Sequence, residues 1–159
     1  MDEPDNIDRV WDIIEKVGIC MLTTQLRARP LEARPVRDAD LVFFVTDVHS
    51  AKEIEIEAAP DVGLVFIDTN DNAYLSITGR ARVVRDPDKT KRVWRKADGV
   101  WWPGGPDDPN VCLLRVEPSR AELWDGPASA AATAFEFAKA RLTGQKPKLG
   151  ENRKVTIAI

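Results

Sequence analysis

The sequence predicts a mainly β protein with added α-helices: an antiparallel β-barrel of six strands with short helices at its periphery. Short runs of β-branched and aromatic residues alternate with polar turns along most of the chain, and this pattern is typical of strands. Few segments are long enough to act as crossovers between parallel strands, which favours an antiparallel sheet over a doubly wound one. Closing such a sheet into a barrel also removes exposed strand edges.

The first part of the chain reads as a helix, three strands and a second helix. Apolar residues recur at helical spacing over residues 6–17, and Gly18 follows where a C-terminal cap belongs. Strands are expected in the segments that come next: 18–24, an interrupted stretch over 28–36, and 40–46, with a turn at 37–40. A short helix from Ser50 to Ala58 precedes Pro60, which would end it.

The second part of the chain continues the sheet and ends in a helix and a polar tail. Strands are expected in four segments: 61–67, 73–84, 111–117 and 120–125, the last two joined at Pro118 and Ser119. Gly79 in the middle of its strand indicates a bulge or bend. A helix from Asp86 to about Ala97 leads into a rigid loop rich in Pro and Gly, and another helix covers the Ala-rich stretch 128–142. Residues 143–159 are expected to form a C-terminal tail.

Composition indicates a single domain over residues 1–159 of a soluble protein. Hydrophobic residues make up 43% and charged residues 31%, as in ordinary globular proteins. No apolar run approaches the roughly 18 residues of a membrane helix, and the acidic N-terminus lacks the basic start of a signal peptide. We therefore expect a cytoplasmic protein with no membrane contact. A net charge of −3 argues against a nucleic-acid partner, despite several basic residues in the tail.

Metal and nucleophile chemistry have little support in the sequence. His49 is the only histidine, and the chain has no GxSxG elbow, no GxxxxGK[ST] loop and no GxGxxG. Cys20 and Cys112 lie in apolar strand-like runs without CxxC spacing, which predicts reduced thiols in the core. The acidic residues Asp68, Asp107 and Asp108 could hold a cation, but such residues are usually just solvated. We expect no metal site and no catalytic acid, base or nucleophile.

The stretch TDVHSAKE, residues 46–53, supports two interpretations. Ser50 and Glu53 fit the S-x-x-E capping box of a helix N-terminus, which needs no ligand. Lys52, however, is a cation in the first helical turn, where the helix dipole disfavours positive charge. An anion beside Lys52 would remove this conflict, because free amides, a hydroxyl and an ammonium group together make a phosphate site. A cap and a phosphate site are compatible here.

A second basic element lies upstream of this stretch. Arg29 and Arg34 lie in an extended segment that Pro30 and Pro35 keep from becoming helical. If this segment runs antiparallel to the strand over 40–46, its N-terminal part approaches Lys52, and Arg29 can share the same anion. The alternative is an edge strand whose arginines are only solvated.

The order of these motifs resembles the FMN-binding split-barrel proteins related to pyridoxamine 5'-phosphate oxidase. In that family a strand with R-P or R-x-V precedes a strand that ends in T-x-x-x-S-x-K, followed by a short helix, a Pro and a V-x-L-x-F strand. This chain has the same features in the same order: Arg29-Pro30, Thr46, Ser50, Lys52, Pro60 and the strand VGLVF over 62–66. The later segments WWPGGPDDP, LLRVEP, AELWD and TGQKPKLGENRKV are similar to the general stress protein 26 branch, so the likeness covers nearly the whole chain.

The resemblance implies a six-stranded split barrel, a homodimer and two FMN sites at the subunit interface. By position, Ser50 and Lys52 would hold the FMN phosphate, with Arg29 close to the phosphate or the flavin. Contacts to the isoalloxazine ring would come from four further residues of the same chain: Pro30, Leu31, Val45 and Thr46. The partner chain would contribute three residues: Tyr74, Ser76 and Trp124. For the tryptophans at 101, 102 and 124, packing in a core or interface is an equally good interpretation.

The sequence departs from the oxidase itself in two places. Ala51 stands where the S-R-K segment of the oxidase has a second phosphate-binding Arg, and the stretch RLTG over 141–144 does not supply the C-terminal R-L-x-P-R signature. The resemblance therefore implies an FMN-dependent oxidoreductase of unknown substrate, and not oxidation of pyridoxamine phosphate. Hydride would arrive at or leave flavin N5, so this chemistry requires no protein acid or base. A non-catalytic flavin-binding or sensing stress protein and a reductase that uses deazaflavin F420 are the alternatives.

Overall fold

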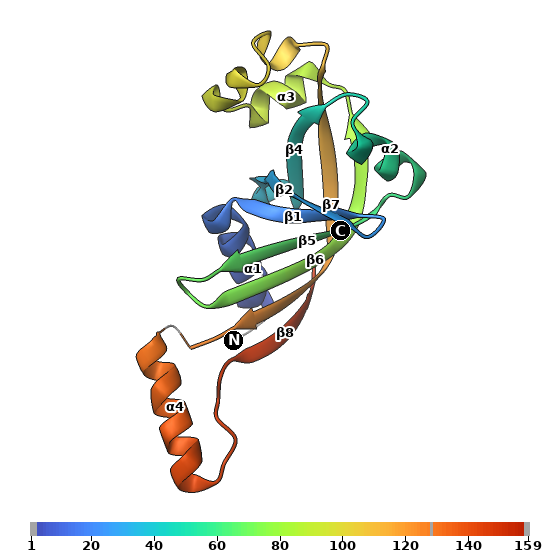
Figure 1. The fold of residues 1–159 in the computed structure, drawn as a ribbon. Helices are drawn as coiled ribbons and strands as arrows, with labels where there is room; N and C mark the ends of the chain where they lie inside the picture. The colour runs from blue at the N-terminus through green and yellow to red at the C-terminus, as the bar shows by residue number, and fades with distance from the viewer. Residues whose placement is uncertain (1–2, 128, 158–159) are drawn as a thin grey trace.

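In the computed structural model, which describes residues 3–127 and 129–157, eight strands form one antiparallel sheet that curls into a half-barrel (Figure 1). The strands have these bounds: β1 Ile19–Thr24, β2 Arg27–Glu32, β3 Arg34–Val36, β4 Leu41–Asp47, β5 Asp61–Asp68, β6 Ala73–Val84, β7 Val111–Asp125 and β8 Glu151–Thr156. Their order across the sheet is β2-β1-β5-β6-β7-β4-β3. The long strand β7 pairs with β4 through its first half and with β8 through its second half.

The two end strands of the sheet follow each other directly in the sequence. Strands β2 and β3 stand at opposite ends of the strand order, yet only the buried residue Ala33 separates them in sequence. The Ala33 amide donates a 2.6 Å hydrogen bond to the Gly18 carbonyl, which fixes the bend where the chain passes from one end of the sheet to the other. The sheet therefore encloses a core without a complete ring of strand pairs, and the predicted split barrel with short peripheral helices is confirmed.

The number of strands differs from the predicted six for local reasons. The bend at Ala33 divides the expected strand over 28–36 into β2 and β3. The expected strands over 111–117 and 120–125 join into one strand, because Pro118 sits where the register with β6 shifts and a missing amide is tolerated. Residues 151–156, expected within a polar tail, pair with β7 as β8.

Gly79 lies at the irregularity that its position in the strand predicted. The register between β6 and β7 shifts between Thr78 and Gly79, so the predicted bulge is confirmed. A Cβ atom on Gly79 would lie 2.5 Å from the backbone oxygen of Glu117. Only glycine allows the two strands to approach this closely.

Helices occupy the periphery of the sheet. The four α-helices of the described residues are α1 Glu3–Val17, α2 Ala51–Ala58, α3 Pro87–Val93 and α4 Ala130–Thr143, and the short 3₁₀ helices are η1 Arg37–Ala39, η2 Lys96–Val100 and η3 Gly105–Asp107. The helix expected from Asp86 to Ala97 stops at Val93, because Trp94 is extended. No helix of the described residues is both long and apolar enough to cross a membrane.

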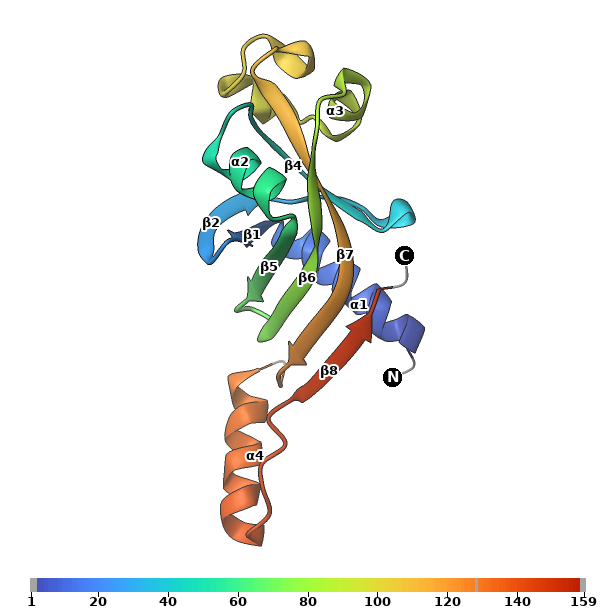
Figure 2. The ribbon, with the colours of Figure 1, turned by 90° about the vertical axis from the view of Figure 1, so that its right-hand side faces the viewer.

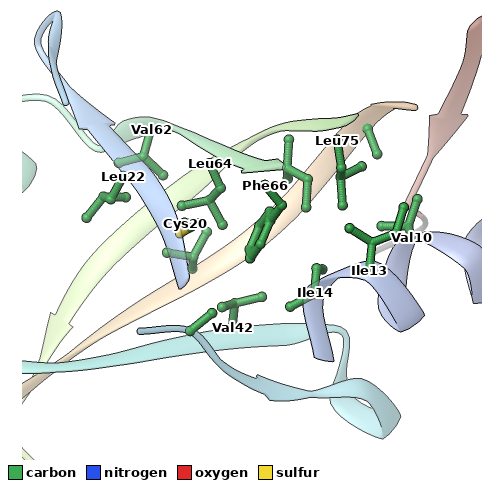
Figure 3. Packing of buried hydrophobic residues seen from close by; sticks show 14 of the residues in the cluster. Val10, Ile13, Ile14, Cys20, Leu22, Val42, Val62, Leu64, Phe66 and Leu75 are labelled. Atoms are coloured by element: carbon green, nitrogen blue, oxygen red, sulfur yellow. The ribbon is translucent and has the colours of Figure 1, made fainter. Parts of the chain in front are cut away.

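The core lies between the inner face of the sheet and one face of α1. Val10, Ile13 and Ile14 of α1 are fully buried and point toward Phe66 and Leu75 of the sheet (Figure 3). The predicted core thiols are confirmed: both cysteines of the described chain are free and buried. Burial raises the pKa of Cys20 to about 12 and that of Cys112 to about 11, so neither is a reactive thiolate at neutral pH.

Candidate functional site

The N-terminus of α2 lies where the chain leaves strand β4. The Val48 amide bonds the Asn110 carbonyl at 2.9 Å, and His49 then takes a left-handed conformation with φ of 58°. Ser50 returns to an extended conformation and caps the helix, accepting a 3.4 Å hydrogen bond from the Glu53 amide. The chain thus turns from β4 into α2 within three residues, and the helix begins directly after the end of the strand.

Glu53 completes the cap from inside the protein. Its carboxylate is buried and accepts a hydrogen bond from the His49 amide, one residue before the Ser50 amide of a standard capping box. Its other oxygen pairs with Arg85, which directly follows β6. The expected cap is thus present, and Glu53 ties it to the end of β6.

Lys52 plays no part in this cap. The side chain is half-buried in the first turn of α2, and no hydrogen bond or ion pair joins it to any described residue. A lysine that stabilises a protein normally faces a carboxylate or the C-terminal end of a helix. The geometry therefore retains the conflict with the helix dipole that an anion would relieve.

Arg29 reaches α2 from the neighbouring strand β2. Its Nη2 donates a 2.7 Å hydrogen bond to Glu55 Oε2, and the Arg29 side chain is only 18% exposed. Its Nη1 is buried and has no hydrogen-bond partner among the described residues. Because Lys52 and Glu55 are three residues apart on α2, they occupy neighbouring positions on one helix face. Arg29 thus contacts α2 about one helical turn from Lys52.

Glu55 is the residue that organises this cluster, and the sequence reasoning missed it. Its carboxylate accepts hydrogen bonds from the Thr24 hydroxyl, from Arg29 and from Arg27 Nη1 at 2.8 Å. The Thr24 hydrogen bond, followed by the one from Arg29, lowers the pKa of Glu55 to about 2. The only signal in the sequence was its spacing of three residues from Lys52, which alone could not identify the strand residues that meet it.

Four residues that the resemblance assigned to the flavin ring lie on the strands around this cluster. Thr46 is buried and Val45 is half-buried near the end of β4. On β2, Leu31 packs partly against the core, whereas Pro30 is exposed on the opposite face of the strand. All four therefore lie on the two strands that lead to Arg29 and Ser50.

Tyr74, Ser76 and Trp124 form a separate group on the outer face of the sheet. Tyr74 and Trp124 are directly opposite each other on β6 and β7 and are 42% and 38% exposed. Strand β6 meets the segment after α2 at Ala81, whose amide bonds the Pro60 carbonyl at 2.8 Å. Tyr74 and Ser76 lie seven and five residues before Ala81 on β6, which corresponds to about 23 Å and 17 Å of strand. Within one chain these three side chains do not come together with Arg29 and Lys52.

The Trp-rich loop after α3 borders the end of β4. Trp102 Nε1 donates a 2.8 Å hydrogen bond to Asp47 Oδ1, and its ring lies 6.2 Å from the ring of Trp94. Packing therefore accounts for Trp102, whereas Trp101 is 78% exposed. Arg34, which the sequence grouped with Arg29, is buried in a 2.7 Å ion pair with Asp98 of the same loop. It stabilises the loop and does not join the Arg29 cluster.

The chemistry of the α2 cluster is that of an anion site. Lys52 lies in the first turn of α2, and Arg29, which has an unsatisfied buried donor, contacts the same helix about one turn later at Glu55. Such an arrangement suits a phosphate. No group of three or more His, Cys, Asp or Glu residues within 3–127 and 129–157 could hold a metal ion.

Known proteins share both the sequence pattern and the fold of this chain. The family model described as pyridoxamine 5'-phosphate oxidase like matches residues 5–148. General stress protein 26 of Bacillus subtilis (strain 168) is 23% identical over 128 residues, which cover 77% of this chain and 91% of that protein. A crystal structure described as general stress protein 26 from Jannaschia sp. CCS1 has a TM-score of 0.80 and 28% identity, and covers 98% of this chain and 100% of that chain. The crystal structure of a general stress FMN/FAD binding protein from Xanthomonas citri has a TM-score of 0.70 and 24% identity, and covers 79% of this chain and 92% of that chain.

These matches agree with the motifs on which the resemblance depended. The family match over residues 5–148 contains every candidate site residue on β2, β4, α2, β6 and β7. The relatives in Bacillus and Jannaschia confirm the expected likeness to general stress protein 26. The chain belongs to the pyridoxamine 5'-phosphate oxidase-like family.

Proposed function

We propose that this protein binds FMN, with the phosphate held at the N-terminus of α2 by Ser50, Lys52 and Arg29. One observation carries the proposal: Arg29 presents a buried, unsatisfied Nη1 beside a helix whose first-turn lysine has no partner among the described residues. A buried donor without an acceptor costs about 1–3 kcal/mol, so a ligand that supplies the acceptor is favoured. A relative described as a general stress FMN/FAD binding protein supports a flavin as that ligand.

The flavin ring would lie between two copies of the chain, which form a homodimer. In support of this, Tyr74, Ser76 and Trp124 are too far from α2 to serve the same site within one chain. They belong to the exposed face of the sheet formed by β1, β5, β6 and β7. This face includes several large apolar side chains: Ile19, Met21, Val65, Ile67, Tyr74 and Trp124. Contiguous exposed apolar side chains of this kind usually mark an interface.

The proposed reaction class is a flavin-dependent oxidation or reduction of a substrate not yet identified. Bound FMN would supply the hydride transfer itself. The protein would hold the phosphate through Arg29 and Lys52, and would position the ring against Val45, Thr46, Pro30 and Leu31. Ala51 is exposed at the first position of α2 and offers no second arginine for the phosphate, which argues against pyridoxamine 5'-phosphate oxidase activity.

A titration of the purified, flavin-free protein with FMN tests the binding proposal. Replacing Lys52 with Ala removes one charge-assisted hydrogen bond, worth about 1.5–3 kcal/mol, and should weaken FMN binding roughly ten- to a hundredfold. The Lys96→Ala variant removes an exposed lysine outside the cluster and should bind as the native protein does. Equal affinities for the native protein and Lys52→Ala would contradict the phosphate site.

Two further measurements separate the alternatives. Tighter binding of deazaflavin F420 than of FMN would replace the proposed cofactor. Bleaching of the FMN-loaded protein by a reduced nicotinamide, followed by reoxidation with an added acceptor, is expected of an oxidoreductase. Tight binding of FMN without any such turnover would leave a flavin-binding protein and refute the enzymatic part of the proposal.

A further inference from the structure

Residues 129–150 form an arm that stands away from the barrel in two perpendicular views (Figures 1 and 2). The arm consists of α4 and the returning stretch before β8. The arm connects β7 to β8 at the end of their pairing, where Asp125 and Glu151 are direct register partners. The arm is thus an enlarged hairpin connection, and its two ends are held side by side by the sheet.

The helix of the arm is well formed at both ends. Ser129 caps it by accepting a 3.1 Å hydrogen bond from the Ala132 amide. At the other end Gly144 adopts φ of 67°, and its amide bonds the Ala140 carbonyl at 2.9 Å. The returning stretch is tied to the helix by a 3.0 Å bond from the Lys148 amide to Glu136 Oε2. The arm therefore has a defined local structure.

Packing within the chain does not support this helix. None of the 14 residues of α4 is buried. An isolated helix shorter than about 12–15 residues is marginally stable in water, even when it is rich in alanine. Capping contributes too little to change this. Contact with a surface outside the chain would supply the stabilisation that α4 lacks within it.

The arm carries large apolar side chains that are more than half exposed. Phe135, Phe137 and Leu142 are 65%, 54% and 87% exposed. Phe135 and Leu142 are seven residues apart and lie on one face of the helix. Phe137, two residues after Phe135, lies on the opposite side of the helix, where it borders a hollow shared with Asn70 and Asn72. Phe135 and Leu142 therefore form the exposed apolar stripe of the arm, and such a stripe on a projecting element indicates a surface for protein contact.

The charge of the arm differs in sign from that of the rest of the chain. Its basic residues are Lys139, Arg141, Lys146 and Lys148, against the single acidic residue Glu136. The arm thus has a net charge of +3 in a chain of net charge −3, which leaves −6 for the remainder. A second copy of this chain presents an acidic body to a basic arm, and this complementarity favours pairing between copies.

We infer that the arm docks on a second copy of this chain, with Phe135 and Leu142 buried against the partner barrel. The arm begins shortly after Trp124, at the edge of the exposed apolar face of the sheet. Its helix of 14 residues is about 21 Å long, which is enough to pass across an adjoining copy. In a symmetric dimer the contact occurs twice, each arm on the opposite barrel. The inference rests on the proposed homodimer and adds to it an exchanged element.

Hydrogen exchange of the full chain tests this inference, after sedimentation has established the dissociation constant of the dimer. Amides of residues 131–144 should be protected at least tenfold at concentrations where the dimer predominates. On dilution to monomer they should lose that protection, while the amides of β7 keep theirs. Equal arm protection in monomer and dimer, or unprotected arm amides in an intact dimer, would overturn the docking. A chain that stays monomeric at every concentration would instead overturn the homodimer, and the docking with it.

A matched pair of variants provides a second measurement. The double variant Phe135→Ser, Leu142→Ser should raise the dissociation constant of the dimer at least tenfold. A control with Leu26→Ser and Val100→Ser changes side chains that are 98% and 81% exposed elsewhere, and should change the constant less than twofold. Unchanged dimerisation of the Phe135→Ser, Leu142→Ser variant would refute the role given to these two side chains.

Discussion

Arg29 is fixed at one nitrogen and open at the other: Nη2 bonds Glu55 Oε2 at 2.7 Å, while Nη1 is buried without a hydrogen-bond partner among the described residues. Glu55 holds the guanidinium plane in place from α2, so little side-chain entropy remains to be lost when a ligand binds. Pre-organised donors of this kind bind anions more strongly than flexible ones do. The pair also joins a strand residue and a helix residue that are 26 positions apart in sequence.

We expect the Arg29→Met variant to lose FMN affinity roughly ten- to a hundredfold, because one charge-assisted hydrogen bond is worth about 1.5–3 kcal/mol. The matched control is Arg27→Met: Arg27 pairs with the same carboxylate but its side chain is 68% exposed. That variant should bind FMN as the native protein does. Calorimetric titration gives both constants, and similar losses for the two variants would show that only the general positive potential matters.

Acid should weaken the contact between α2 and the strands beneath it. The pKa of Glu55 lies at about 2 in the folded protein, below its ordinary value of 4.5, because Thr24 and the arginines stabilise the ionised form. The ionised carboxylate therefore stabilises the fold fully above about pH 4.5, and this contribution is lost as the pH falls toward 2.

The Glu55→Gln variant lacks this ionisation. Its melting temperature should lie below that of the native protein at pH 6, and the difference should shrink steadily between pH 4.5 and 2. Thermal unfolding of both proteins across this range provides the check. The exposed neighbour Glu57→Gln serves as the control, with no such convergence expected. A difference that stayed constant down to pH 2 would contradict the assignment.

Local patterns in the sequence were enough to predict the elements that pack by their own periodicity. Helix α1, the cap at Ser50 and the bulge at Gly79 each depend on neighbouring residues, and the structure confirms them. Glu55 and its partners Thr24 and Arg29 could not be identified in this way, because the contact depends on which strand lies beneath α2. The strand β8 was missed for a similar reason: its polar residues pair with β7, and only Val155 and Ile157 nearby enter the core.

Glu53 is expected to be the most sensitive carboxylate of α2. Its buried side chain accepts from the His49 amide and pairs with Arg85. The Glu53→Gln variant removes the charge and leaves these donors poorly satisfied, so the free energy of unfolding should fall by about 1–3 kcal/mol. The Glu57→Gln variant, on the exposed face of the same helix, should change it by less than about 0.5 kcal/mol. Urea unfolding measures both, and equal effects would show that burial of Glu53 is not decisive.

The close approach of β6 and β7 gives the clearest expectation for a glycine. A Cβ at position 79 would lie 2.5 Å from the Glu117 carbonyl oxygen, a backbone atom that cannot rotate away. The Gly79→Ala variant should therefore lose about 1–3 kcal/mol of stability, or more if the strands separate. Gly99 is the matched control, because a Cβ there would have no atom within 4 Å, and Gly99→Ala should leave stability nearly unchanged.

Because β6 and β7 also carry Tyr74, Ser76 and Trp124, separation of the strands should weaken FMN binding along with stability. Urea unfolding together with FMN titration tests both effects, and a Gly79→Ala protein as stable as Gly99→Ala would show that the bulge can shift at no cost.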